Sequence, residues 1–386
     1  MILLSHPTVN AFNRALAEAL HRAGKLAAFH TTISFGRRSL AIPRKSLRFH
    51  PWPEMGRLIL QRLGFRAALR SGPLSVDAVY RSLDAAVARH LGDARAVYAY
   101  EDGALETFWA ARGRGLPRFY ELPIAYWETV HRLLREEAER LPDWAFTLGA
   151  PDDSPEKLAR KTEELTLADL VVCPSRFVQN SLPPSAPSIV AEFGSPPVSA
   201  LSARAATGPL RVLFAGSMTQ RKGLADVFAA LRILQRKDIE LVVMGAPVAP
   251  HEFYRKQYPD FRYEPPRPHA QVLALMSTCD VLVLPSIVEG RALVQQEALS
   301  CGLPLLVTPN AGGEDLIEPG VNGWLVPIRQ PEALAERLAW FGEHRPLLPE
   351  MRAAARRKAA EITWESYTRK IIAALESVQR QGHASF

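Results

Sequence analysis

The chain has 386 residues, of which 47% are hydrophobic and 23% are charged. This is the composition of a folded globular protein of two or three domains, and it excludes wholesale disorder. The 47 Lys and Arg residues against 40 Asp and Glu give a formal charge of +7, which suits an anionic partner such as a nucleotide, an acidic lipid surface or nucleic acid.

In the first half of the chain, short apolar runs alternate with longer helical patterns. The predicted strands are Ile2–Ser5, Phe29–Ser34, Ala96–Tyr100, Arg118–Leu122, Asp169–Cys173 and Ser188–Glu192, and helical patterns include Asn10–Ala23 and Ala125–Leu141. Alternation of this kind is typical of βαβ units built around a parallel sheet.

One segment of the first half, residues 37–70, is strongly basic. It holds nine Lys and Arg residues against a single acid, Glu54. Arg62, Arg66 and Arg70 recur every four residues among apolar side chains, which is the spacing of a basic amphipathic helix. The segment is either a solvated helix face packed on its own domain or a surface that docks on anionic lipid or an acidic acceptor.

A break separates the two halves. Five prolines between Pro183 and Pro197 precede the Ala- and Ser-rich stretch Ser199–Gly208, which we predict to be a linker. Beyond it, buried parallel strands are predicted at Arg211–Ala215, Glu240–Met244, Asp280–Leu284 and Pro304–Thr308. The predicted fold is therefore α/β, with two doubly wound, Rossmann-like domains facing each other across a cleft where ligands bind.

The loop after the predicted strand Asp280–Leu284 carries two carboxylates, Glu289 and Glu297. If both were helical, they would lie about 12 Å apart along the axis, beyond the roughly 5 to 9.5 Å of a hydrolase acid/base pair. The spacing suits two ends of one elongated ligand, with Glu289 near a sugar and Glu297 near a ribose. Gly290 permits a sharp turn into a helix, whose free N–H groups can hold a phosphate.

A second loop, after the strand Arg211–Ala215, contains Arg221 and Lys222 followed by Gly223. Two adjacent cations on a flexible loop can reach a diphosphate and offset the charge on a departing phosphate. Because both loops follow strands of the same sheet, they are expected to project into the same cleft.

Four segments occur together in one order along the chain. They are ELTLAD at 164–169 followed by PSRF at 174–177, GSMTQRKG at 216–223, the pair Glu289 and Glu297, and AGGEDLIEPGVNGWLVP at 311–327. In these segments the chain resembles the family 4 glycosyltransferases, retaining enzymes of the GT-B fold, over nearly its whole length.

The resemblance implies transfer of a sugar from a nucleotide-diphosphate donor to a glycan, lipid-linked or small-molecule acceptor, without a metal or other cofactor. It implies an acceptor domain at 1–195, a donor domain at 208–362 and a helix at 363–386 that crosses back to the first domain. Lys222 and Arg221 would contact the diphosphate, Glu289 the sugar and Glu297 the ribose. The remaining donor-site positions are Gly216, Ser217, Gly290, Arg291, Ala292 and Leu293.

The chain departs from the family pattern at several positions. Ser217 stands where the family commonly has Arg, and Arg291-Ala292 stand where Phe-Gly is common. The usual Gly-rich loop after the first strand is replaced by a polar loop, and a usual histidine after a middle strand is replaced by Tyr100–Gly103. The candidates for binding phosphate or acceptor in these two places are His6, Asn10 and Asn13, and Glu101 and Asp102. His6 is either a loop residue or a base, and Glu101 and Asp102 could instead cap the helix that follows.

Two other functions remain open at this stage: a nucleotide-sugar epimerase of the same fold and a non-catalytic nucleotide-sugar-binding protein. No motif favours nucleic acid. The three cysteines are far apart, and no apolar run approaches a membrane span, so we predict a cytoplasmic location, either soluble or attached peripherally to the inner membrane face through residues 37–70.

Overall fold

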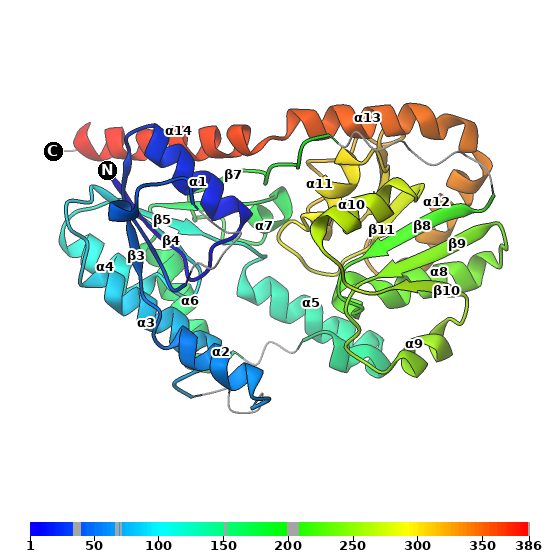
Figure 1. Ribbon diagram of the computed structural model, residues 1–386, viewed down its shortest axis with the longest axis horizontal. Helices are drawn as coiled ribbons and strands as arrows, with labels where there is room; N and C mark the ends of the chain where they lie inside the picture. The colour runs from blue at the N-terminus through cyan, green and yellow to red at the C-terminus, as the bar shows by residue number, and fades with distance from the viewer. Residues whose placement is uncertain (34–39, 66–68, 70–71, 150–152, 199–207, 385–386) are drawn as a thin grey trace.

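The computed structural model describes residues 1–33, 40–65, 69, 72–149, 153–198 and 208–384. In this part of the chain two sheets form two lobes (Figure 1), a seven-stranded sheet of order β3-β2-β1-β4-β5-β6-β7 and a six-stranded sheet of order β10-β9-β8-β11-β12-β13. Neighbouring strands in both sheets pair in parallel. The predicted α/β fold of two facing Rossmann-like sheets is confirmed.

The strands are β1 (Ile2–Ser5), β2 (Leu26–Thr31), β3 (Leu47–Phe49), β4 (Ala96–Tyr100), β5 (Arg118–Glu121), β6 (Leu170–Cys173), β7 (Ser188–Val190), β8 (Leu210–Ala215), β9 (Ile239–Met244), β10 (Phe261–Glu264), β11 (Val281–Leu284), β12 (Leu305–Val307) and β13 (Gly323–Leu325). The helices are α1 (Ala11–Arg22), α2 (Glu54–Arg62), α3 (Val76–Ala88), α4 (Leu105–Gly113), α5 (Trp127–Arg140), α6 (Pro155–Leu167), α7 (Arg176–Asn180), α8 (Leu224–Leu234), α9 (His251–Gln257), α10 (His269–Ser277), α11 (Val294–Ser300), α12 (Pro331–Glu343), α13 (Leu348–Glu361) and α14 (Trp364–Ala384). Short 3₁₀ turns include η4 (Pro142–Thr147) and η5 (Gln220–Lys222).

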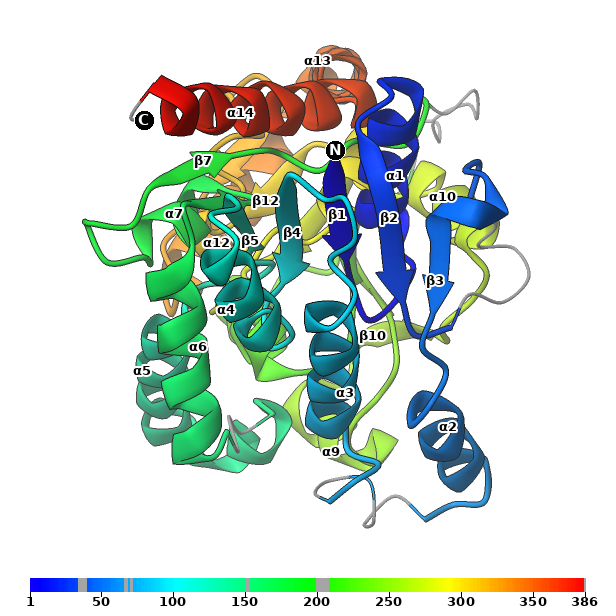
Figure 2. The ribbon, with the colours of Figure 1, turned by 90° about the vertical axis from the view of Figure 1, so that its left-hand side faces the viewer.

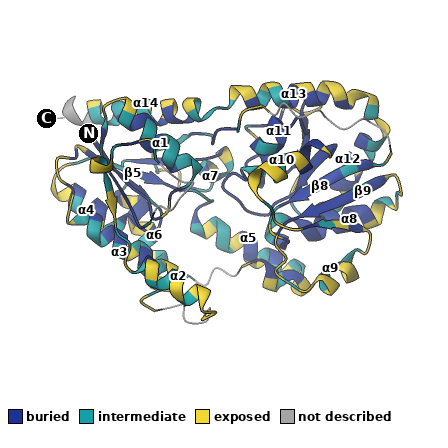
Figure 3. Cartoon of the chain, in the orientation of Figure 1, coloured by how far each residue is buried: buried dark blue, intermediate teal, exposed yellow. Residues whose placement is uncertain are grey.

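The central strands form the core of each lobe. All residues of β1, β6 and β11 are buried, and helices cover both faces of each sheet (Figure 3). Strands covered on both faces are apolar without alternation, which is why these runs are visible in the sequence. Among the described residues, no helix is both long enough and apolar enough to cross a bilayer.

Three strands escape the sequence prediction, and all three lie at sheet edges: β3, β10 and β13. Each has only three or four residues, and β3 and β10 include exposed side chains, so their patterns are not continuously apolar. β2 also begins earlier than predicted, because parallel register pairs Ile2 with Leu26. The predicted end of that strand, Ser34, lies outside the described residues.

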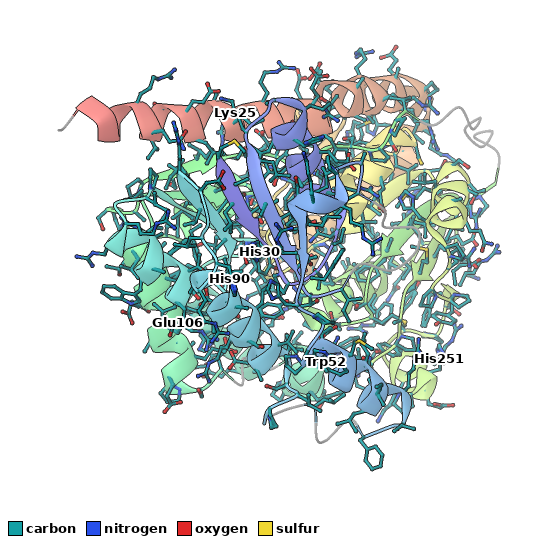
Figure 4. All side chains as sticks on the ribbon, turned by 60° about the vertical axis from the view of Figure 1, so that its left-hand side comes forward. Lys25, His30, Trp52, His90, Glu106 and His251 are labelled. Atoms are coloured by element: carbon teal, nitrogen blue, oxygen red, sulfur yellow. The ribbon has the colours of Figure 1, made fainter. Side chains whose placement is uncertain are left out.

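The C-terminal helix α14 leaves the second lobe and lies along the first (Figures 1 and 2). Its buried residues Tyr367, Ile371 and Leu375 join the core formed by β1, β4 and α1. Lys25, which Figure 4 labels beneath this helix, pairs with Glu376 at 2.8 Å. α14 is therefore part of the first lobe, although the chain reaches it from the second.

The segment made of α5 and η4 crosses in the opposite direction: it comes from the first half of the chain and packs on the second lobe. Trp144 lies in the core of the second lobe, with its ring 4.9 Å from that of Phe253. On α5, the fully buried Glu137 accepts hydrogen bonds from Gln220 at 2.7 Å and from Arg329 at 2.8 Å. The lobes thus exchange segments in both directions. The predicted domain limits, 1–195 and 208–362, stay predictions, and most of the predicted linker lies outside the described residues.

A buried carboxyl in the first lobe should make stability depend on pH. Burial raises the pKa of Glu121 from 4.5 to about 8, and its main partner is the hydroxyl of Tyr367, which donates to Oε1 at 3.3 Å. The folded protein holds this proton up to about pH 8, whereas the unfolded chain releases it near pH 4.5. The contribution of Glu121 to the free energy of unfolding is therefore fully present below pH 4.5 and is lost as the pH rises towards 8.

We expect Glu121→Gln to flatten the loss of stability between pH 5 and pH 8, because the amide stays neutral. Urea unfolding midpoints of wild type and variant at pH 5, 6.5 and 8 test this. Glu128→Gln, at an exposed position of α5, is the control and should follow wild type. Equal pH profiles for Glu121→Gln and wild type would contradict the assignment.

Candidate active site

Two loops of the second lobe are joined where β8 and β11 end. Gly223 ends the first loop with φ +82°, and a Cβ there would lie 2.2 Å from the carbonyl oxygen of Pro285. The N–H of Ile287 also donates to the carbonyl of Arg221 at 2.9 Å. Only glycine tolerates this approach, which holds η5 against the loop after β11.

Three predicted site residues meet at this junction. Lys222 Nζ lies 2.6 Å from Glu289 Oε1, and Arg221 Nη1 lies 2.8 Å from the same oxygen. Burial lowers the pKa of Lys222, although Glu289 opposes the shift. Two cations share one carboxylate, so the cluster keeps a net positive charge. This arrangement can bind a dianionic group if the group takes over the contacts that Glu289 now makes.

Gly216 and Ser217 lie beside this cluster, at the end of β8. A Cβ on Gly216 would meet the side-chain carbons of Lys222 at 3.7 to 3.9 Å, and the carbonyl of Gly216 lies against Gly245. Ser217 is exposed. Gly216 therefore borders the Lys222 side chain, and its predicted role in donor binding, like that of Ser217, stays a prediction.

Position 290 requires glycine for a reason other than the predicted turn into a helix. It does not have a positive φ, and α11 begins only at Val294, so Glu289 lies in a loop. A Cβ on Gly290 would lie 1.6 Å from the carbonyl oxygen of Pro123, in the first lobe. The hydroxyl of Ser175, also in the first lobe, donates to the carbonyl of Gly290 at 2.6 Å. Gly290 is thus a position where the backbones of the two lobes approach closely.

The next three residues also belong to the contact between the lobes or to the core. Arg291 is buried, and it donates to the carbonyl of Pro174 at 2.5 Å and to Asp315 at 2.6 Å. Ala292 lies in the core of the second lobe, and Leu293 packs on the core of the first. The structure uses Arg291 to join the lobes, so donor binding by these three positions stays a prediction.

Glu297 lies one helical turn into α11, separate from the cluster of Lys222. Its Oε1 lies 3.0 Å from Nε2 of His269, which is the first residue of α10. Sequence reasoning missed His269, because β10, the strand that precedes it, was not predicted. The run Pro265–His269 after the alternating segment Phe261–Glu264 was the available signal.

In the first lobe, His6, Asn10 and Asn13 shape the loop after β1. Asn10 and Asn13 form a reciprocal capping box at the start of α1, with bonds of 3.1 and 3.0 Å. His6 accepts the N–H of Thr8 at its Nδ1, and burial lowers its pKa to about 3. Such an imidazole is neutral and a poor base near pH 7. Of the two interpretations of His6, the structure supports the loop residue, and binding of phosphate or acceptor by these residues stays a prediction.

Glu101 and Asp102 make their ion pairs with α6 and not with the second lobe. Lys161 Nζ lies 3.3 Å from Glu101 Oε1, and Lys157 Nζ lies 3.3 Å from Asp102 Oδ2. Burial raises the pKa of Glu101 to about 7, against the influence of Lys161. Acceptor binding by this pair stays a prediction.

Glu164 and Asp84 cap α4, so the alternative role proposed for Glu101 and Asp102 is wrong. The carboxylate of Glu164 accepts the N–H groups of Asp102 and Ala104 at 3.0 Å and of Leu105 at 3.2 Å, and that of Asp84 accepts those of Glu106 at 2.8 Å and Thr107 at 2.9 Å. Both carboxylates are distant in sequence, Glu164 by about 60 residues, and local spacing cannot reveal them.

Comparison with known proteins relates the second lobe to a described family. The family model described as "Glycosyl transferases group 1" matches residues 200–361, which hold Lys222, Glu289 and Glu297. A D-inositol 3-phosphate glycosyltransferase of Jonesia denitrificans is 29% identical over 179 residues, which are 43% of this chain and 42% of that protein. The chain therefore spans less than half the length of the curated relatives it matches.

Solved structures are similar over the whole chain. The sucrose-phosphate synthase of Thermosynechococcus elongatus has a TM-score of 0.68 and 15% identity, with 100% of this chain and 99% of that chain covered. HepE of Anabaena, solved in complex with UDP, has a TM-score of 0.67 and 15% identity, with 97% and 99% covered. At this identity the likeness shows the fold. Residues 200–361 thus match the group 1 glycosyltransferase family, and the chain as a whole has the GT-B fold of these solved structures.

Proposed function

We propose that the protein transfers a sugar from a nucleoside-diphosphate sugar, with retention at the anomeric carbon and without a metal, to a glycan, glycolipid or small-molecule acceptor. The observation that carries the proposal is the cluster in which Lys222 and Arg221 share the single carboxylate of Glu289. Support for the donor class comes from HepE, which has been solved with UDP and with UDP-glucose.

The cluster suits the departure of a nucleoside diphosphate. As the sugar–phosphate bond breaks, negative charge grows on the leaving phosphate, and Lys222 and Arg221 lie ready to offset it. When the diphosphate takes these two cations, Glu289 is released to accept hydrogen bonds from the sugar hydroxyls. The leaving phosphate can then take the proton of the acceptor on the same face, so no protein nucleophile is needed.

The pair Glu297 and His269 suits the ribose end of the donor. Glu297 is partly exposed, and its neighbour His269 can reorient because more than half of its side chain is exposed. A carboxylate at this place can accept both ribose hydroxyls. Neither rival function, epimerase or binding protein, is favoured by a contact in the described residues.

A donor screen with the purified protein tests the proposal. We expect at least one nucleoside-diphosphate sugar to bind in calorimetry and to be slowly hydrolysed. Glu297→Ala should weaken the binding of the sugar nucleotide and the binding of its free nucleoside diphosphate to the same extent, about tenfold, because both ligands carry the ribose. Glu336→Ala, on the exposed face of α12, is the control. If no nucleotide sugar binds or is hydrolysed, the proposed function is wrong.

A further inference from the structure

Large apolar side chains are exposed together around α2. The set, which we call the α2 surface, is Phe49, Trp52, Met55, Ile59, Leu63 and Phe65. Four of its members are more than half exposed: Trp52 at 67%, Leu63 at 64%, Phe65 at 58% and Ile59 at 52%. Single exposed apolar residues are common on proteins, but a contiguous group marks an interaction site.

These side chains point outwards because the other face of α2 is already used. Glu54 is buried, and a Cβ on Gly56 would meet the side chain of Leu74 at 3.0 Å. Met55, Ile59 and Leu63 follow at intervals of four residues, so they form one stripe along the helix and its C-terminal residue. Figure 1 shows α2 at the lower margin of the first lobe, and Figure 3 shows exposed residues along it.

The charge around the α2 surface is positive. Residues 40–65 hold five basic residues, Arg44, Lys45, Arg48, Arg57 and Arg62, and one acid, Glu54. Arg57 forms two 2.6 Å hydrogen bonds with Glu54, which leaves the other four cations without an acidic neighbour in this segment. All four are exposed. The remaining basic residues of the predicted segment, Arg37, Arg38, Arg66 and Arg70, lie outside the described residues.

The combination of apolar and basic side chains indicates which kind of partner the α2 surface binds. An acidic protein would match the cations but not the protruding stripe, whereas the interface of an anionic bilayer accepts apolar tips below its headgroups and cations at its phosphates. Trp52, which Figure 4 labels in the lower part of the molecule, has a side chain that is enriched at the interface between membrane and water. We propose that the α2 surface docks the first lobe on the face of an anionic phospholipid bilayer.

This docking is interfacial. α2 has nine residues and packs at Gly56 against Leu74, so its outer stripe is the part that can enter the headgroup region. The cluster of Lys222 and Glu289 belongs to the other lobe and takes no part. Binding to a bilayer and binding to a donor can therefore fail independently.

Co-sedimentation with vesicles tests the docking. The intact protein should bind vesicles of equal parts phosphatidylglycerol and phosphatidylcholine, and binding should weaken as salt rises from 50 to about 300 mM. Ile59→Ser combined with Leu63→Ser should lower the partition coefficient at least about tenfold. Arg62→Glu should lower binding to anionic vesicles and reduce its dependence on salt.

Matched controls separate the α2 surface from general stickiness. Ile233→Ser replaces an apolar residue of similar exposure, 51%, on the second lobe, and Arg369→Glu reverses an exposed cation on α14. Both should bind vesicles as wild type does. Thermal unfolding checks that every variant folds.

Three results would overturn the proposal: no binding of the intact protein to anionic vesicles at low salt, equal binding by Ile59→Ser/Leu63→Ser, or equal loss in the Ile233→Ser control. A concentration-dependent dimer that the double variant converts to a monomer, without vesicle binding, would assign the surface to a second copy of the chain instead.

Discussion

Lys222→Ala is expected to lower kcat/KM for sugar transfer by about 100- to 1,000-fold, the range for losing one preorganised group that stabilises developing charge. Lys222 Nζ holds Glu289 at 2.6 Å in the free protein, so the variant loses a diphosphate contact and leaves Glu289 paired with Arg221 alone. Release of nucleoside diphosphate under saturating acceptor measures the effect. Lys237→Ala, an exposed lysine that follows α8, is the control and should match wild type.

A second substitution in the cluster separates binding from chemistry. Glu289→Gln removes the carboxylate that competes for the two cations, so free nucleoside diphosphate should bind more tightly while transfer becomes slower. Weaker binding of the free diphosphate in Glu289→Gln, or full activity in Lys222→Ala, would show that the cluster is structural.

Gly290→Ala is the second substitution with a large expected effect. The added methyl group would lie 1.6 Å from the carbonyl oxygen of Pro123. Rotation cannot relieve this contact, because the backbone fixes the position of a Cβ and the carbonyl oxygen is itself a backbone atom. We expect the free energy of unfolding to fall by about 2 to 3 kcal/mol, the upper range for overpacking, and activity to fall with it. Urea unfolding and the transfer assay measure the two effects.

Gly113→Ala is the matched control for Gly290→Ala. Gly113 lies at the end of α4, has no positive φ, and a Cβ there meets nothing within 4 Å. The free energy of unfolding of Gly113→Ala should equal that of wild type or be slightly higher, as is usual when alanine replaces glycine in a helix. If Gly290→Ala is as stable as Gly113→Ala, the lobes do not meet as closely as described.

The sequence predicts the interior of the fold better than its margins. Strands β6 and β11 are fully buried and continuously apolar, whereas edge strands such as β3 and β10 are short and partly exposed. The contact of Lys222, Arg221 and Glu289 also follows from the sequence, because loops after neighbouring parallel strands meet at one edge of the sheet.

What the sequence does not predict are contacts between distant segments. Glu164 caps α4 across about 60 residues, and Gly290 fits a carbonyl in the other lobe. Arg291 illustrates the limit, because its type and position suit a phosphate, yet its hydrogen bonds go to Pro174 and Asp315. Residue type and spacing indicate which groups can do chemistry, but long-range packing decides which of them are free to do it.

The passage of α5 and η4 into the second lobe has a consequence for folding. The chain crosses between the lobes after β5, before α6, between β7 and β8 and before α14. A fragment limited to residues 208–362 would lack Trp144, whose ring packs against Phe228 and Tyr254 in its core. Neither lobe is therefore a self-sufficient folding unit, and the two should unfold in a single cooperative transition.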